Sequence, residues 1–131
     1  MPVIFVEDTQ SRSVPKVRKM IRAVNKAVSG ALELPPNTVW VKYSPGRPDL
    51  YGEGADGKVP VDWRPVFVFV RMTEGRDPKQ VQKLYAPVSS AIAKAFDMFP
   101  DFVWIRIEEF HPDKVGQGAH SYTEIRKKSK R

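Results

Sequence analysis

The first part of the chain changes from a strand pattern to a helix pattern. Val3 to Val6 is a short, apolar and β-branched run of the kind that forms a buried strand. From Val17 onward, apolar residues recur at spacings of three and four, which predicts a helix with one buried face. Ser13 is a suitable N-cap for this helix, and Gly30 with Pro35-Pro36 is expected to end it.

A second strand is predicted at 38–43, and the same order of elements then recurs. Residues 65–71 predict another strand, and Asp77-Pro78 combines a capping residue with a proline in the first turn, which indicates a helix start. Pro87 is expected to kink this second helix. Residues 102–107 predict the last strand of the core.

The two halves of the sequence match each other, without a gap, at an offset of 64 residues. The matching segments are Ile4-Phe5-Val6 with Val68-Phe69-Val70, Arg12 with Arg76, Pro36 with Pro100, and Val39-Trp40-Val41 with Val103-Trp104-Ile105. Two copies are too few for a solenoid. We therefore interpret residues 1–131 as one domain built of two repeats, 2–44 and 65–108, which a loop over 44–63 connects.

Each repeat predicts a strand–helix–strand unit. Such a unit pairs its two strands in parallel with a right-handed crossover. Two units side by side give an α/β (α+β) fold, a four-stranded sheet with both helices on one face. The other face of this sheet is left bare, and a second copy of the chain is the simplest cover for its apolar residues.

Composition narrows the possible chemistry. A length of 131 residues is typical of one domain with its own core. The chain has no cysteine and only two histidines, which excludes disulfides and thiolate zinc sites and argues against a histidine-rich metal site. No apolar run approaches the ~18 residues of a membrane span, and the first residues do not resemble a signal peptide. We expect a cytoplasmic protein without a membrane partner.

The net charge of +7 is concentrated at the end of the sequence. Five basic residues lie within 126–131, and the rest of the chain is nearly balanced. A basic run can bind nucleic acid, but a solvated, frayed terminus is the more ordinary interpretation. We therefore interpret 126–131 as a frayed basic tail and do not expect nucleic acid as a partner.

Pro2 is the most distinctive single residue. Removal of the initiator methionine would give the chain a secondary amine at its N-terminus. Burial and nearby guanidinium groups would lower the pKa of that amine, and a base with a pKa near 7 is well suited to proton transfer in water. Alone, Pro2 is equally consistent with a proline that merely begins a strand.

The order and spacing of these motifs resemble the tautomerase superfamily. The resemblance rests on Pro2 with its following strand, on Val39-Trp40-Val41, on Glu74-Gly75-Arg76 at a helix start, and on Val103-Trp104-Ile105. It covers residues 2 to 110 and is greatest to fused two-unit relatives of 4-oxalocrotonate tautomerase and cis-3-chloroacrylic acid dehalogenase. It implies trimers, a catalytic N-terminal proline, and no metal or organic cofactor.

The resemblance also implies roles for individual residues. Pro2 matches the catalytic proline, and Arg76 matches the arginine that the second unit supplies to that proline. A guanidinium group suits this role because its planar fork binds a carboxylate through two hydrogen bonds. Arg12 is the counterpart of Arg76 in the first repeat, and we interpret it as structural or as a relic of the duplication, because Pro65 is internal and has no amine.

Other positions are matched less closely. Trp104 stands where the family has a second-strand arginine, and Arg106, two residues later on the same strand face, is a candidate replacement. Thr73 stands where the dehalogenases have another arginine, and Tyr51 falls near an aromatic residue of the family pocket. We expect Arg106, Trp104, Tyr51 and Thr73 to contact substrate.

Two further positions lack the dehalogenase residues. Ser29 replaces a helix histidine, and Gly116 or Gln117 replaces the acid that activates water. Dehalogenation and hydration are therefore not favoured. His120 and Tyr122 follow the last strand. They could close the pocket, but residues in such positions more often lie simply on the surface, and we interpret them so.

The sequence leads to one favoured function and two rivals. We expect a tautomerase in which Pro2 is the general base for keto–enol conversion of a small 2-oxo or enol carboxylic acid, within a homotrimer. A decarboxylase of the malonate-semialdehyde type, or a dehalogenase-like or hydratase-like relative, is the alternative within enzymes. A non-catalytic binding or assembly module with a basic tail is the alternative outside them.

Overall fold

Four strands form the main sheet of the computed structural model, which describes residues 1–58 and 64–129. The strands are β1 (Val3–Asp8), β2 (Trp40–Ser44), β3 (Val66–Thr73) and β4 (Val103–Phe110). Their order across the sheet is β2-β1-β3-β4, with β1 parallel to β2, β3 parallel to β4, and β1 antiparallel to β3. This confirms the predicted α+β arrangement of two strand–helix–strand units.

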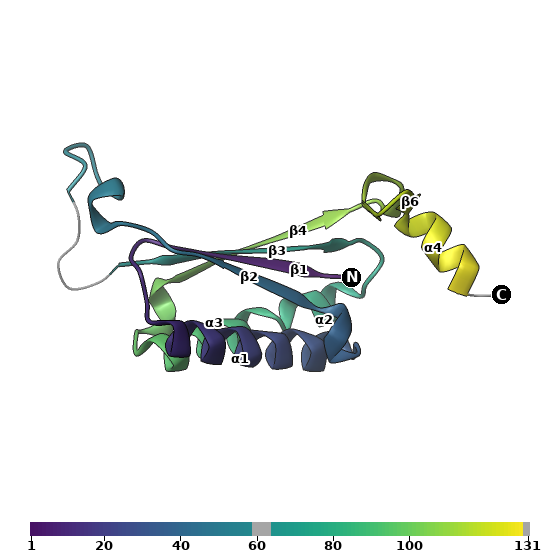
Figure 1. Ribbon diagram of the computed structural model, residues 1–131, viewed down its shortest axis with the longest axis horizontal. Helices are drawn as coiled ribbons and strands as arrows, with labels where there is room; N and C mark the ends of the chain where they lie inside the picture. Colours follow the sequence, from purple (N-terminus) through teal and green to yellow (C-terminus); the bar gives the residue numbers. More distant parts are fainter. Residues whose placement is uncertain (59–63, 130–131) are drawn as a thin grey trace.

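The helices of both units cover one face of the sheet (Figure 1). They are α1 (Val14–Leu32), α2 (Pro78–Gln82) and α3 (Tyr85–Phe96). The core lies between the two layers, because every second residue of a strand faces the helices. Its fully buried members include Ile4, Val6, Met20, Val24, Val68, Val70, Leu84, Val88, Ile92 and Phe96. None of the helices in the described residues is long and apolar enough to cross a membrane.

The first helix begins where the sequence predicts and ends between the two predicted end signals, Gly30 and Pro35-Pro36. The Ser13 side chain accepts a hydrogen bond from the Lys16 amide (3.4 Å), which confirms Ser13 as the N-cap. Gly30 lies inside the helix and does not end it. The chain instead leaves the helix at Glu33, which has a left-handed backbone (φ 54°), and Leu34 N–H closes the end on the Ser29 carbonyl (2.9 Å).

The second helix is broken into α2 and α3. The break falls at Lys83 and Leu84, one turn before Pro87, the residue predicted to kink the helix. Pro87 has no amide hydrogen to give to the Lys83 carbonyl, and its ring crowds that carbonyl. The perturbation therefore appears four residues earlier than the proline itself.

The chain beyond β4 continues past the end of the sheet at which β1 starts (Figure 1). After β4 come a small hairpin of β5 (Gly116–Gln117) and β6 (His120–Ser121), then the helix α4 (Tyr122–Ser129). Figure 1 shows α4 at the same end of the sheet as the N-terminus. The prediction of a frayed tail is wrong for 126–129, which form the last turn of α4; 130–131 lie outside the described residues.

The predicted loop 44–63 begins at the end of β2. It contains a short 3-10 helix (Pro48–Leu50) and a bridge between Glu53 and Lys58. Residues 59–63 of this loop lie outside the described residues. The described part of the loop, 44–58, projects from the sheet at the end opposite α4 (Figure 1).

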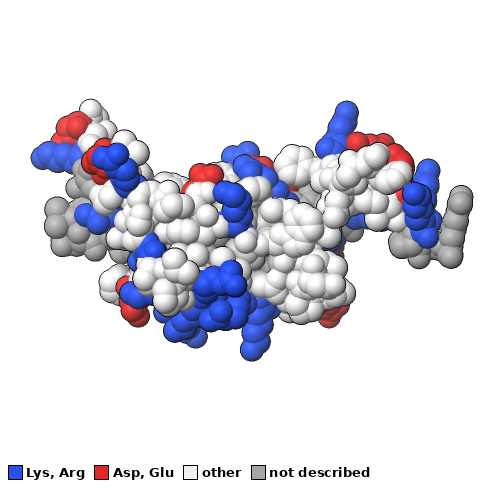
Figure 2. All heavy atoms as spheres, in the orientation of Figure 1, with Lys and Arg blue, Asp and Glu red and all other residues white. Residues whose placement is uncertain are grey.

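Positive charge is not confined to the end of the chain. Helix α1 carries five basic residues and no acidic one, and Figure 2 shows lysine and arginine side chains gathered over the helical layer. The opposite face of the sheet is aromatic. Trp40 and Trp104 are 45% and 46% exposed there, and the Trp104 ring lies 5.7 Å from Phe69 and 5.8 Å from Phe67, centroid to centroid.

Candidate active site

The N-terminus lies at the mouth of a cavity of about 440 Å³, which we call the N-terminal cavity. Its walls include Met1, Leu34, Pro35, Arg76, Tyr122 and Arg126. Pro2 itself is buried at the start of β1, where its carbonyl oxygen accepts a hydrogen bond from the Trp40 amide (3.1 Å). The cavity therefore joins the first residues of the chain to both repeats and to α4.

Thr73, at the end of β3, holds two arginine side chains at this cavity. Arg76 Nη1 donates to the Thr73 carbonyl oxygen (2.8 Å), and Arg126 Nη2 donates to Thr73 Oγ1 (2.7 Å). Thr73 is fully buried. Burial and the neighbouring charge of Arg126 lower the pKa of Arg76, while Glu109 acts in the opposite sense. One buried threonine thus brings two guanidinium groups into the same electrostatic environment.

The amine at the chain start is affected by both arginines. Burial lowers the pKa of the Met1 amine below its ordinary value, and the positive charges of Arg76 and Arg126 lower it further. Each effect disfavours the ammonium form. An amine at this end of β1 is therefore biased toward its neutral, basic form.

A second, apolar hollow adjoins the chain start. It has a volume of about 220 Å³ and is lined by Met1, Val3, Phe5, Phe110 and Tyr122, among others. Tyr122, which was predicted to be a surface residue, is 8% exposed and lines both this hollow and the N-terminal cavity. This combination of apolar walls with nearby cations suits a small organic anion.

Sequence analysis did not identify Arg126 or assign Tyr122 to the site. The available signal was the spacing of Tyr122, Ile125 and Arg126, which places all three on one side of a helix. The dense run of basic residues concealed this pattern, because such runs are usually solvated.

Arg12 and Arg76 are equivalent in the repeat but differ in their partners. Arg12 Nε donates to Asp8 Oδ2 (3.0 Å), and its Nη1 donates to the Phe96 carbonyl oxygen (3.1 Å). The Asp8 side chain is fully buried. At the same offset of 64, Met72 stands in the place of Asp8, so Arg76 lacks the carboxylate partner that Arg12 has at that position.

The structure does not bring the other predicted substrate contacts to this cavity within one chain. Trp104 pairs with Phe67 near the far end of the sheet. The Tyr51 ring lies 6.0 Å from the Phe67 ring, and burial with a hydrogen bond to Glu53 raises the pKa of Tyr51 to about 12. Arg106 Nε is 3.1 Å from Glu108 Oε1 on the open sheet face.

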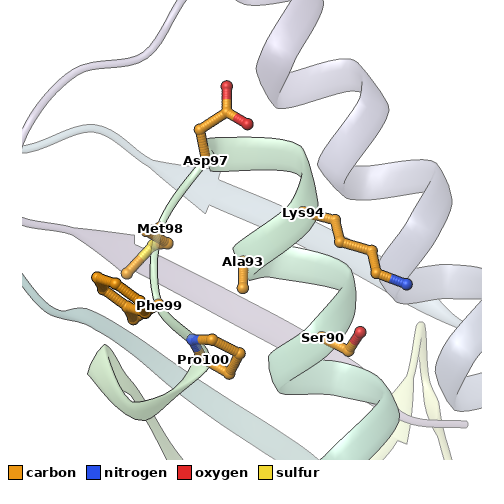
Figure 3. A pocket seen from close by; sticks show the side chains of 7 residues that line it. All are labelled: Ser90, Ala93, Lys94, Asp97, Met98, Phe99 and Pro100. Carbon is orange, nitrogen blue, oxygen red and sulfur yellow. The ribbon is translucent and has the colours of Figure 1, made fainter.

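The remaining features show no comparable chemistry. Over residues 1–58 and 64–129, no cluster of three histidine, cysteine, aspartate or glutamate side chains is arranged to hold a metal ion. A hollow of about 450 Å³ lies between the end of α3 and the segment that follows it (Figure 3). Its walls include Lys94, Asp97 and Phe99, and it contains no part of the chain start.

Comparison with known proteins gives structural matches only. No family model matches the sequence, and no curated protein sequence matches it. A fused 4-OT that forms an asymmetric trimer superposes with a TM-score of 0.84 and 18% identity, over 94% of this chain and 98% of that chain. The FG41 malonate semialdehyde decarboxylase inhibited by 3-bromopropiolate superposes with a TM-score of 0.75 and 20% identity, over 96% of each chain.

A third solved structure also superposes on nearly the whole chain. The macrophage migration inhibitory factor of Toxoplasma gondii superposes with a TM-score of 0.73 and 17% identity, over 91% of this chain and 98% of that chain. At these identities, the likenesses establish a shared fold across nearly the whole chain.

Proposed function

We propose that this chain, which has the tautomerase fold, is a tautomerase that uses the amine of Pro2 as its general base. Its substrate is a small carboxylic acid with a 2-oxo or enol group. The observation that carries the proposal is the position of the chain start, which lies beside Arg76 and Arg126 in a partly buried cavity where the pKa of an amine is lowered.

The base of this reaction is the secondary amine that removal of Met1 would expose. Pro2 is buried, so desolvation acts on its nitrogen as it does on the Met1 amine. The guanidinium charges of Arg76 and Arg126 act on the Met1 amine, one residue away along the chain. A neutral amine near pH 7 accepts a proton from the carbon next to the substrate carbonyl group and then returns it to the conjugated system. This proton transfer consumes no co-reactant.

Arg76 and Arg126 bind the substrate carboxylate and stabilise the enolate charge. Guanidinium groups fixed in advance at a partly buried site stabilise developing negative charge more effectively than water does. Thr73 fixes both side chains through its carbonyl and hydroxyl oxygens. Since Met72 replaces the acid that occupies Arg12 in the other repeat, a substrate carboxylate is the natural partner for Arg76.

The remaining predicted contacts belong to an assembly. The aromatic face of the sheet needs a cover, and the fused 4-OT neighbours form trimers. In a homotrimer, Trp104, Arg106 and Tyr51 of a neighbouring copy would border the site and contact substrate. This arrangement accounts for their distance from Pro2 within one chain.

Decarboxylation is the second candidate, because two structural neighbours are malonate semialdehyde decarboxylases with TM-scores of 0.75. The same amine and arginines could act on a 3-oxo acid, with cleavage of a carbon–carbon bond and release of carbon dioxide. Hydration is not favoured. Gln117, which lines the N-terminal cavity, is an amide and cannot accept a proton from water as a carboxylate does.

A pair of assays tests these proposals. Ketonisation of the enol of phenylpyruvate is followed by its ultraviolet absorbance, and carbon dioxide release is measured from malonate semialdehyde. We expect the first activity in the purified protein, and we expect Pro2→Ala to lower it at least a hundredfold, within the range of general-base catalysis. Full activity in Pro2→Ala would remove Pro2 from the mechanism, and decarboxylation alone would favour the second candidate.

A further inference from the structure

The internal repeat creates a second pocket at the opposite end of the sheet from Pro2. This pocket has a volume of about 200 Å³, and we call it the internal pocket. Its walls include Gln10, Arg12, Arg64, Met98, Phe99 and Phe102. It lies where β1 ends and where the chain enters β3.

The two pockets are built from equivalent positions. At the offset of 64 residues, Arg12, Met98, Phe99 and Phe102 of the internal pocket correspond to Arg76, Leu34, Pro35 and Thr38 of the N-terminal cavity. In each case the arginine comes from one repeat and the other three residues come from its neighbour. The duplication has therefore kept a pocket at equivalent positions at both ends of the sheet, although their volumes differ.

The pockets differ in their polar groups. The chain is continuous through Arg64 and Pro65 at the internal pocket, so no amine is present there to act as a base. Arg12 is already bound to the buried carboxylate of Asp8. The additional cation is Arg64, whose Nε atom is buried and has no hydrogen-bond partner among the described residues.

A buried guanidinium nitrogen without a partner requires an explanation, since buried donors are nearly always satisfied. The Nε–H and the adjacent Nη group of an arginine form a fork that matches the two oxygens of a carboxylate. We propose that the internal pocket binds a small organic carboxylate through Arg64, as a second site without proton-transfer activity.

The walls favour an organic anion over an inorganic one. Phe99 and Phe102 form an edge-to-face pair with their ring centroids 5.9 Å apart, and Met98 lies beside them. These side chains make one part of an otherwise polar wall apolar, and the body of an organic ligand would lie against that part while Arg64 binds its charged end.

One acidic residue, Asp97, lines the pocket, and a second, Asp8, is bound to the lining residue Arg12; both have other partners. Asp8 accepts hydrogen bonds from Arg12 Nε and from the Tyr43 hydroxyl group (2.7 Å). Asp97 is 85% exposed and lies 3.8 Å from Lys16 Nζ. Figure 3 shows the Asp97 carboxyl group extending away from the Phe99 ring. Among the described residues, neither of these acids forms an ion pair with Arg64.

The test uses benzoate as the probe and the full-length Arg76→Gln variant as the protein, so that the N-terminal cavity is impaired. The side-chain Nε–Hε signals of arginine are followed by nitrogen-15 NMR during the titration. We expect the Arg64 signal, assigned by its loss in a further Arg64→Gln variant, to shift saturably with benzoate. An Arg64 signal that does not respond would overturn the proposal, whether or not the protein has tautomerase activity.

Matched variants separate binding from folding. We expect Arg64→Lys, which keeps the charge but loses the fork, to bind benzoate at least tenfold more weakly, while its thermal unfolding is unchanged. Arg47→Gln, at an exposed arginine paired with Asp49, should bind normally. Equal binding in Arg64→Lys would refute the role of the fork. Equal affinity for inorganic phosphate and benzoate would refute the preference for an organic ligand.

Discussion

Arg12 and Arg76 occupy equivalent positions in the repeat, yet their replacement by alanine should have different effects. Replacement of Arg76 should lower activity, and replacement of Arg12 should lower stability. Arg76→Ala removes a charged hydrogen-bond partner of the substrate carboxylate, which is worth about 1.5–3 kcal/mol. At 1.36 kcal/mol per factor of ten, kcat/KM should fall about tenfold to 150-fold. The fold should change little, because within the described residues the hydrogen bond of Arg76 goes to a backbone carbonyl oxygen, that of Thr73.

Arg12→Ala should instead lower stability. It leaves the buried carboxylate of Asp8 without its cation, a loss that costs about 3–5 kcal/mol in other proteins. We expect about 3 kcal/mol here, because the amide of Thr9 and the hydroxyl group of Tyr43 still donate to Asp8. For a chain of this length, that corresponds to a fall of roughly 10 °C in Tm.

The two variants are compared by steady-state kinetics on the phenylpyruvate enol and by thermal unfolding followed by circular dichroism. Kinetics are measured well below the Tm of Arg12→Ala, so that both variants are folded. If Arg12→Ala loses as much kcat/KM as Arg76→Ala at that temperature, or if Arg76→Ala is the less stable variant, then the assignment of the two arginines is wrong.

Three further predictions follow from the site and the open sheet face. Arg126→Ala removes a positive charge that lowers the pKa of the N-terminal amine. The pKa of this base should therefore rise, and the acidic limb of the pH profile of kcat/KM should move to higher pH. An unchanged acidic limb would exclude Arg126 from the site. Thr73→Val deletes the hydroxyl group that accepts a hydrogen bond from Arg126 Nη2. The loss of this hydrogen bond, worth about 1 kcal/mol, should lower kcat/KM about fivefold. Equal activity would show that the hydrogen bond does not contribute to catalysis. Light scattering should give the mass of three chains for the parent protein. Trp104→Glu should lower that mass, whereas Val14→Glu, on the helical face, should not. A monomeric parent protein would contradict the proposed trimer.

Much of the fold could be predicted because its physical causes are local. Apolar residues alternate along β1 and β3 and recur at helical spacing along α1, so each element has one buried face. The repeat then required that the second unit resemble the first. The helix was predicted to kink at Pro87, but it breaks one turn earlier. The sequence shows the position of the proline, whereas the break occurs at the carbonyl group of Lys83, which receives no hydrogen bond from Pro87.

The candidate site was only partly predictable. Pro2, Thr73 and Arg76 lie at adjacent strand and helix ends, and the structure brings them together at one end of the sheet. Arg126 and Tyr122 were missed, because α4 has few apolar residues and its position depends on contacts with the distant Thr73. Trp104, Arg106 and Tyr51 lie elsewhere in the chain, and their proposed role depends on a neighbouring copy.

The central claim is that Pro2 carries a free amine of lowered pKa. The most direct test is a nitrogen-15 NMR titration of the purified protein labelled at proline. The account predicts one proline nitrogen that titrates, with a pKa below that of an ordinary N-terminal proline amine. The absence of a titrating proline nitrogen, as when Met1 is retained, or a pKa at or above the ordinary value, would contradict it.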